Sequence, residues 1–194
     1  HTAYRRQRQM CIRDSPIASE NPSSFILHRS SFLPQMITPL PTRPRLSTAA
    51  TNRIVVVASR YNAEFVEPMV AKALSEITLI EPHTKTQVVH APGSFEIPHL
   101  ARKAIDHLKA DAVICLGVIF KGETGHADLI AASVSDTLCR MSVETLTPVI
   151  HGVLLLDNKE QARARCLEEE INRGTEAARA AIEVLRASRA MAGR

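Results

Sequence analysis

The run Ala112-Val113-Ile114-Cys115-Leu116-Gly117-Val118 decides the fold class of this chain. Every residue in it is apolar or glycine, and β-branched side chains recur, so the run predicts a strand that is buried on both faces. Strands of this kind are typical of parallel sheets that are covered by helices on both sides. We therefore expect the neighbouring segments to alternate between short apolar strands and amphipathic helices.

Three further apolar runs predict strands around this central one, at about residues 54–58, 86–90 and 148–156. Between the first two strands, apolar side chains recur at helical spacing and predict an amphipathic helix. They are Val66, Met69, Val70, Ala73, Leu74 and Ile77. Further helices are predicted at about 95–108, 127–144 and from 158 onward, the last one interrupted near 172–174. This alternation predicts an α/β fold, a flavodoxin-like three-layer α/β/α sandwich with a four-stranded parallel sheet.

Residues 1–50 differ in composition from the rest of the chain. Six of the eleven prolines lie before Arg53, and the segment shows no sustained periodicity, so we expect a disordered tail. Its many arginines and serines and its few acids also fit a transit peptide. Gln9–Asp14 resembles the translation of a sequencing-library adapter, so at least part of the tail is expected to be an artefact, with Met36 as the start. Residues 51–194 are predicted to form one domain.

Charge is distributed unevenly between these two parts. Residues 1–53 carry eight arginines and two acids, a net charge of +6, whereas the remainder carries 16 basic and 18 acidic residues, a net charge of −2. The body therefore lacks the basic face that binds nucleic acid. Its cysteines are widely spaced, and no apolar run reaches the roughly 20 residues of a membrane span. We expect a cytoplasmic protein that holds no metal and no cofactor and binds neither nucleic acid nor membrane.

Functional residues of parallel α/β folds lie beyond the carboxyl ends of the strands. Tyr61 and Asn62 follow the first strand, where a ring can stack on a planar heterocycle and an amide can read its polar edge. Alternatively, Tyr61 packs on the sheet rim and Asn62 caps the next helix. After the second strand, Ser94 could cap a helix and, with Phe95, expose backbone N–H groups. Glu96 could accept hydrogen bonds from a polyol or only favour the helix dipole.

The third strand is followed by Gly122-Glu123-Thr124-Gly125-His126. Two glycines bracket a loop that runs into a helix, where free N–H groups can bind a phosphate, although the spacing is not that of a P-loop. His126 stands at the helix entrance and could transfer protons near neutral pH. The alternative is a histidine that caps the helix or lies on the surface.

Strand four and the helical region after it carry His151, Arg165 and Arg173. Surface ion pairs with the glutamates at 168–170 are the default expectation for the two arginines. Phosphate binding is the more specific alternative, because a guanidinium fork matches phosphate oxygens.

The order and spacing of these motifs resemble the lumazine synthase family. The resemblance rests on Arg60-Tyr61-Asn62, Pro92-Gly93-Ser94-Phe95-Glu96-Ile97-Pro98 and Gly122-Glu123-Thr124-Gly125-His126, and it extends through Thr147–Ile150 and Glu160–Ala162. It covers about residues 53–185. It implies condensation of 5-amino-6-(D-ribitylamino)uracil with 3,4-dihydroxy-2-butanone 4-phosphate to 6,7-dimethyl-8-ribityllumazine, with release of phosphate and water. It also implies a homo-oligomer, either a pentamer or an icosahedral shell of pentamers.

The same resemblance implies roles for the residues of one subunit. Tyr61 would stack on the pyrimidine, residues 94–96 would hold the ribityl chain, and residues 122–124 would bind phosphate. His126 would be the catalytic residue, transferring protons. The substrate-binding residues of this subunit would be Tyr61, Asn62, Ser94, Phe95, Glu96, Val118, Ile119, Gly122, Glu123 and Thr124.

A neighbouring subunit is expected to supply His151, Arg165 and Arg173 to the same site. Arg165 matches the phosphate-binding arginine of the family. His151 stands where the family usually has a phenylalanine, Arg173 where it has a lysine, and Gly125 where Thr, Ser or Pro is common. Two alternatives with the same fold remain: a flavin- or lumazine-binding module without catalysis, and an archaeal-type riboflavin synthase. The loop from Gly122 to His126 argues against the second.

Overall fold

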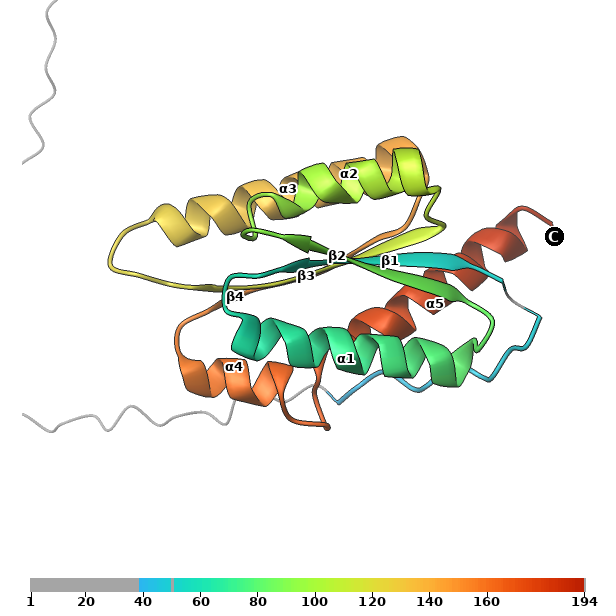
Figure 1. Cartoon of the computed structure of the whole chain (residues 1–194), viewed down its shortest axis with the longest axis horizontal. Coiled ribbons are helices and arrows are strands. Elements are labelled where there is room, and N and C mark those ends of the chain that lie inside the picture. The colour runs from blue at the N-terminus through green and yellow to red at the C-terminus, as the bar shows by residue number, and fades with distance from the viewer. Residues whose placement is uncertain (1–38, 50, 194) are drawn as a thin grey trace, which may run out of the picture. The chain divides into compact units, whose positions relative to one another are not determined.

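The structure, a computed structural model, describes residues 39–49 and 51–193. Within these residues, four strands form one parallel sheet in the order β2-β1-β3-β4. The strands are β1 (Arg53–Ser59), β2 (Lys85–Ala91), β3 (Ala112–Phe120) and β4 (Val149–Leu156). The helices are α1 (Ala63–Ile80), α2 (Ile97–Leu108), α3 (His126–Thr145), α4 (Lys159–Cys166) and α5 (Arg173–Met191) (Figure 1). The predicted α/β sandwich with a four-stranded parallel sheet is confirmed.

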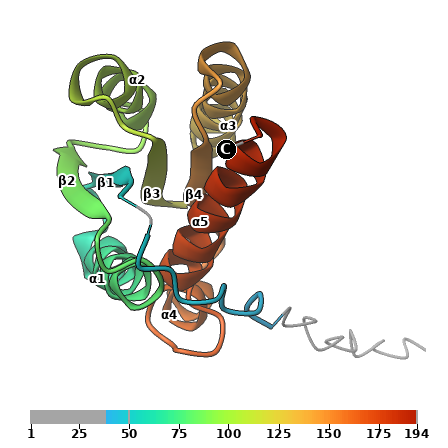
Figure 2. The same ribbon diagram turned by 90° about the vertical axis from the view of Figure 1, so that its right-hand side faces the viewer.

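Two apolar cores lie on the two faces of this sheet. The alternation of side chains along β1 divides them: Ile54, Val56 and Ala58 enter one core, whereas Val55 and Val57 enter the other. The first core is closed by α1, α4 and α5, and the second by α2 and α3, which gives the three layers seen in Figure 2. Because all four strands are parallel, their carboxyl ends lie at the same edge of the sheet, with those of β1 and β3 in its middle.

No helix among the described residues is long and apolar enough to cross a membrane.

The beginning of α2 differs from its predicted position. The sequence predicts a helix from about Phe95 with Ser94 as its cap, but α2 begins at Ile97, and Glu96 is its N-cap without a side-chain capping bond. Pro98 explains the later start, because proline lacks a backbone N–H and is tolerated only in the first helical turn. Residues 92–96 therefore remain a loop at the end of β2.

The predicted interruption between the last two helices is confirmed at Asn172. Its side-chain oxygen accepts hydrogen bonds from the backbone N–H groups of Gly174 and Thr175 at 3.0 and 3.3 Å, which caps α5. Its amide nitrogen donates to the carbonyl of Cys166 at 2.7 Å, so the capping residue is tied to the end of α4. A side chain at Gly174 would collide with the backbone of Met69, so α5 begins in close contact with α1.

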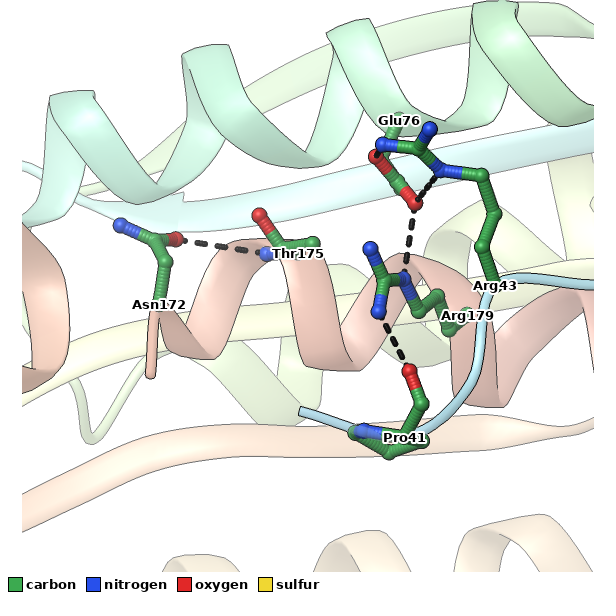
Figure 3. Close-up of polar contacts among 6 residues, drawn as sticks. All are labelled: Pro41, Arg43, Glu76, Asn172, Thr175 and Arg179. Carbon is green, nitrogen blue, oxygen red and sulfur yellow. Dashed lines mark hydrogen bonds and ion pairs between the residues drawn. The ribbon is translucent and has the colours of Figure 1, made fainter. Parts of the chain in front are cut away.

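A buried carboxylate joins α1 and α5 along their contact (Figure 3). Glu76 is only 4% exposed and accepts hydrogen bonds from Nε of Arg43 and Nε of Arg179, both at 2.7 Å. Arg179 also donates to the carbonyl of Pro41. Burial alone would raise the pKa of Glu76, but the two guanidinium groups outweigh it and hold the pKa below its ordinary value. Glu76 is therefore charged at neutral pH and requires its partners.

These contacts place residues 41–47 along α1 and α5. The N–H of Ser47 donates to the carbonyl of Ile80 at 2.9 Å, and Arg186 donates to the carbonyl of Arg45 at 2.9 Å. The composition of the tail does not predict these contacts. The expected adapter-derived segment and the proposed start at Met36 lie outside the described residues.

Candidate active site

A pocket of about 630 Å³ opens beyond the carboxyl ends of β1, β2 and β3. Its volume is in the range of small-molecule sites. The structure brings eight of the predicted site residues together there, with further apolar groups beside them. The lining residues are Tyr61, Asn62, Gly93, Ser94, Phe95, Glu96, Val118, Ile119, Phe120, His126, Ala127 and Ile130.

Tyr61 occupies the turn between β1 and α1, and its side chain is 70% exposed. It therefore does not pack into the rim of the sheet, and the ring is free to contact a ligand. Asn62 adopts the left-handed conformation, with φ of 58°, and makes no side-chain capping bond to α1. Its amide nitrogen instead donates to the carbonyl of Val118 at 2.8 Å. Asn62 is thus the N-cap residue of α1 and caps it through its backbone carbonyl, but its side chain does not cap the helix.

The loop after β2 presents Ser94, Phe95 and Glu96 to the pocket. Ser94 is 8% exposed and lies over Gly117 of β3, where an added side-chain carbon would lie 2.8 Å from the serine oxygen. Phe95 is 60% exposed. Glu96 accepts the N–H of Gly93 at 3.0 Å through Oε2. This bond folds the loop back on itself and makes the carboxylate part of the pocket wall.

The phosphate loop predicted after β3 lies beside the pocket. Residues 121–125 are all exposed, and His126 is the first residue of α3 and lines the pocket. Gly125 is the N-cap of α3 and has no side chain that could cap the helix, so no side-chain bond of the N-cap occupies the N–H groups of the first turn. Lys121 forms an ion pair of 2.9 Å with Asp157, which raises the lysine pKa above its ordinary value. This pair ties the start of the loop to the end of β4.

A second hollow, about 420 Å³ in volume, runs along β4 and the beginning of α5. It contains His151, Arg173 and Glu176 and shares no lining residue with the pocket. The Nε2 of His151 lies 2.9 Å from the hydroxyl of Ser135 on α3, and burial lowers the pKa of His151 below its ordinary value. Arg173 pairs with Glu176 through one terminal nitrogen, while its buried Nε has no hydrogen-bond partner among the described residues.

Arg165 lines neither hollow and lies half-buried on α4. The ion pairs with the glutamates at 168–170 that the sequence favours are not formed by Arg165 or Arg173 within the described residues. Glu169 pairs instead with Lys72 at 2.6 Å. Among residues 39–49 and 51–193, no group of three or more His, Cys, Asp or Glu side chains could hold a metal ion.

Comparison with known proteins decides the family. A family profile described as 6,7-dimethyl-8-ribityllumazine synthase matches residues 51–189. The chain belongs to this family. Proteins named 6,7-dimethyl-8-ribityllumazine synthase from Methylobacterium radiotolerans and Chlorobium chlorochromatii are 38% identical to it over 147 and 148 residues. These alignments cover 76% and 74% of this chain and 87% and 94% of the relatives. A third, from Salinibacter ruber, is 38% identical over 137 residues, covering 69% of this chain and 86% of the relative.

Two residues of this lumazine synthase fold shape the pocket and were not predicted from the sequence. The hydroxyl of Ser59 accepts the N–H of Tyr61 at 3.1 Å and donates to the carbonyl of the same residue at 3.3 Å. Gly117 leaves room for Ser94. A glycine inside an apolar strand often marks a close approach, which was an available signal for Gly117. No sequence signal separates Ser59 from any serine at a strand end.

Proposed function

We propose that this chain catalyses the condensation of 5-amino-6-(D-ribitylamino)uracil with 3,4-dihydroxy-2-butanone 4-phosphate to 6,7-dimethyl-8-ribityllumazine, releasing phosphate and water. The observation that carries the proposal is the pocket, in which Tyr61, Glu96 and His126 lie together in a chain of the lumazine synthase family. We also propose that the enzyme acts in the cytoplasm and uses no cofactor.

The pocket offers a different kind of group for each part of the substrates. The exposed ring of Tyr61 is suited to stacking on the pyrimidine, with Val118 and Ile119 as the apolar floor. The hydroxyl of Ser94 and the carboxylate of Glu96 are suited to the hydroxyls of the ribityl chain, with Phe95 beside them.

We propose that the loop after β3 binds the phosphate of the substrate and that His126, at the end of this loop, transfers protons. The backbone N–H groups of Gly122, Glu123 and Thr124 and those of the first turn of α3 are proposed to bind the phosphate oxygens, as free N–H groups at a helix start are suited to do. His126 would move protons during imine formation, loss of phosphate and ring closure. Both substrates already carry their reactive groups, so orientation in the pocket can supply most of the acceleration.

Charge at the pocket supports a site completed by a second copy of the chain. Of the described residues that line it, none is arginine or lysine, although one substrate carries a phosphate. Arg165 and Arg173 lie elsewhere on the chain, and Arg173 lines the hollow at the open edge of β4 with His151. We infer that a neighbouring subunit supplies these three residues, in a head-to-tail contact that closes as a pentamer, alone or within an icosahedral shell.

The test is to mix the two substrates with the protein and follow the fluorescent lumazine product. The expected result is formation of lumazine well above the rate of the same mixture without protein. Binding of lumazine without acceleration would identify a non-catalytic binding module instead. Conversion of lumazine supplied alone into riboflavin would identify a riboflavin synthase.

A further inference from the structure

The turn between β1 and α1 combines an exposed ring with a tightly bonded backbone. The ring of Tyr61 is 70% exposed, yet hydrogen bonds hold the chain on both sides of it. The preceding residue also takes part, because the N–H of Arg60 donates to the carbonyl of Ala91 in β2 at 2.8 Å. The turn is thus bonded to the ends of both neighbouring strands.

Ser59 holds Tyr61 from the side of β1. It is fully buried, and its hydroxyl accepts the N–H of Tyr61 at 3.1 Å and donates to the carbonyl of Tyr61 at 3.3 Å. A serine hydroxyl has a single proton to donate, so its donor is committed to the backbone of this residue. Ser59 therefore has no proton left for a ligand.

Asn62 holds the turn from the side of β3. It has φ of 58°, a conformation that is uncommon outside glycine and that asparagine tolerates better than most residues. β1 pairs with β3 only as far as Ala58 and Leu116, so the carbonyl of Val118 lies beyond the last paired residue of β1. The amide nitrogen of Asn62 donates to that carbonyl at 2.8 Å and takes the place of a strand partner.

We propose that Ser59 and Asn62 are positioning residues that clamp the backbone of Tyr61, so that its ring stands at the pocket before substrate arrives. The proposal rests on the proposed function in taking Tyr61 as the residue that stacks on the pyrimidine. A ring on a fixed backbone stacks at a smaller entropic cost than a ring on a mobile turn. It gives Asn62 a role apart from reading the edge of the pyrimidine, because one N–H of its amide is already bonded to Val118, although the second N–H and the amide oxygen are left for a ligand.

The first test needs no substrate and uses the fluorescence of Tyr61. The chain has no tryptophan and two tyrosines, Tyr4 and Tyr61, so Tyr4→Phe leaves Tyr61 as the sole emitter. In this background, Asn62→Gly keeps the left-handed backbone accessible but removes the amide, and Ser59→Ala removes the hydroxyl. Time-resolved anisotropy should show a larger amplitude of fast motion for Tyr61 in either variant.

The matched control is Lys109→Gly, which replaces another left-handed residue, with φ of 53°, at the end of α2. It removes no contact near the pocket and should leave the anisotropy of Tyr61 unchanged. If both clamp variants fold and their anisotropy equals that of the parent, the clamp does not exist. The two variants probe opposite sides of the turn, so a folding defect in one leaves the other to decide.

The second test separates positioning from direct contact with substrate. Asn62→Gly should lower kcat/KM for the pyrimidine substrate by about three- to tenfold, the effect of one neutral hydrogen bond. In a Tyr61→Ala background the same change should cost less than about twofold, because there is no ring left to position. An equal loss in both backgrounds would show that Asn62 contacts the substrate and would overturn the proposal. If the wild-type chain formed no lumazine, the proposed function would fail, while the anisotropy would still decide the clamp.

Discussion

The pocket at the ends of β1, β2 and β3 and the hollow along β4 are built in opposite ways. The pocket is lined by segments at the ends of three strands, and hydrogen bonds tie the turn after β1 to the ends of both β3 and β2, from Asn62 to Val118 and from Arg60 to Ala91. The hollow follows an edge strand and contains the ion pair of Arg173 with Glu176, and the buried Nε of Arg173 has no hydrogen-bond partner among the described residues. The described lining of the pocket includes no arginine or lysine, whereas that of the hollow includes Arg173. This difference in charge is what the proposed site between two subunits requires, with the pocket from one subunit and arginines from the next.

Mixing two defective variants is the strongest test of the proposal that two subunits share one site. His126→Ala removes the proposed proton-transfer residue of the pocket, and Arg165→Ala removes a residue of α4, outside the hollow, that the neighbouring subunit is proposed to supply. Each ring alone should therefore be nearly inactive with the sugar phosphate at low concentration. After joint unfolding and refolding at equal amounts, about one quarter of the interfaces should pair an intact His126 with an intact Arg165. Activity should therefore recover to about a quarter of the wild-type value. Mixed rings without recovery would show that the two residues belong to the same subunit's site.

The pocket half alone is probed by His126→Ala. The histidine lines the pocket at the first turn of α3, and general acid–base catalysis contributes about 10²–10⁴-fold at most. Turnover should fall within that range but not vanish, because orientation of the substrates is retained. Stopped-flow rates from about pH 6 to pH 8 provide the check. A variant as fast as the wild type across that range would remove His126 from the proton transfers.

The contribution proposed for the neighbouring subunit is probed by Arg165→Ala, with a smaller expected effect than that of His126→Ala. A hydrogen bond to a charged group is worth about 1.5–3 kcal/mol, so KM for the sugar phosphate should rise by about 10- to 150-fold. The KM for the pyrimidine should change little. Arg163→Ala, on an exposed position of the same helix, is the matched control. Equal increases in both KM values for Arg165→Ala would indicate a structural role.

Stacking by Tyr61 should give a still smaller effect. Aromatic contacts contribute about 0.5–1.5 kcal/mol, so Tyr61→Ala should weaken pyrimidine binding by about two- to tenfold. Tyr61→Phe keeps the ring and should be nearly silent. Titration of each variant with the pyrimidine substrate gives the two affinities. A large loss in the phenylalanine variant would assign the interaction to the hydroxyl instead.

A substitution of Glu76 should have the smallest effect on turnover. Glu76 lies between α1, which begins beside the pocket, and α5, which begins beside the hollow. Because the folded pKa of Glu76 is depressed, its stabilising contribution is complete at neutral pH. That contribution declines only as the pH falls below the usual glutamate value of about 4.3 toward the folded value. Glu76→Gln should therefore lower Tm at pH 7, and the gap to the wild type should narrow below about pH 4. A gap that stays constant on acidification would show that the charge of Glu76 is not what stabilises the helices.

The sequence predicted the strands and helices well, but it did not predict the hydrogen bonds that join distant residues at and near the pocket. Apolar runs such as Ala112–Val118 and helical spacing report burial directly, so strands and helices could be read from single segments. The bond from Asn62 to Val118 and the placement of Arg43 beside Glu76 join residues far apart in the chain. Such contacts depend on the register of the sheet and the packing of helices, which no local pattern contains. Most residues of the pocket were predicted from their positions after the strand ends, Val118 and Ile119 were predicted from the resemblance to a family, and the roles of all of them remain proposals.

The close contact of Gly174 with the backbone of Met69 has a consequence for how this chain can vary in length. Asn172 fixes the first turn of α5, and Gly174 leaves no space between the two helices, so the register of α5 is set at these positions. The preceding residues 167–170 are exposed and carry no such constraint. An insertion there would be absorbed as a longer surface loop. An insertion of a single residue after Asn172 would rotate the whole of α5 by about 100° and turn Arg173 away from the edge of the sheet.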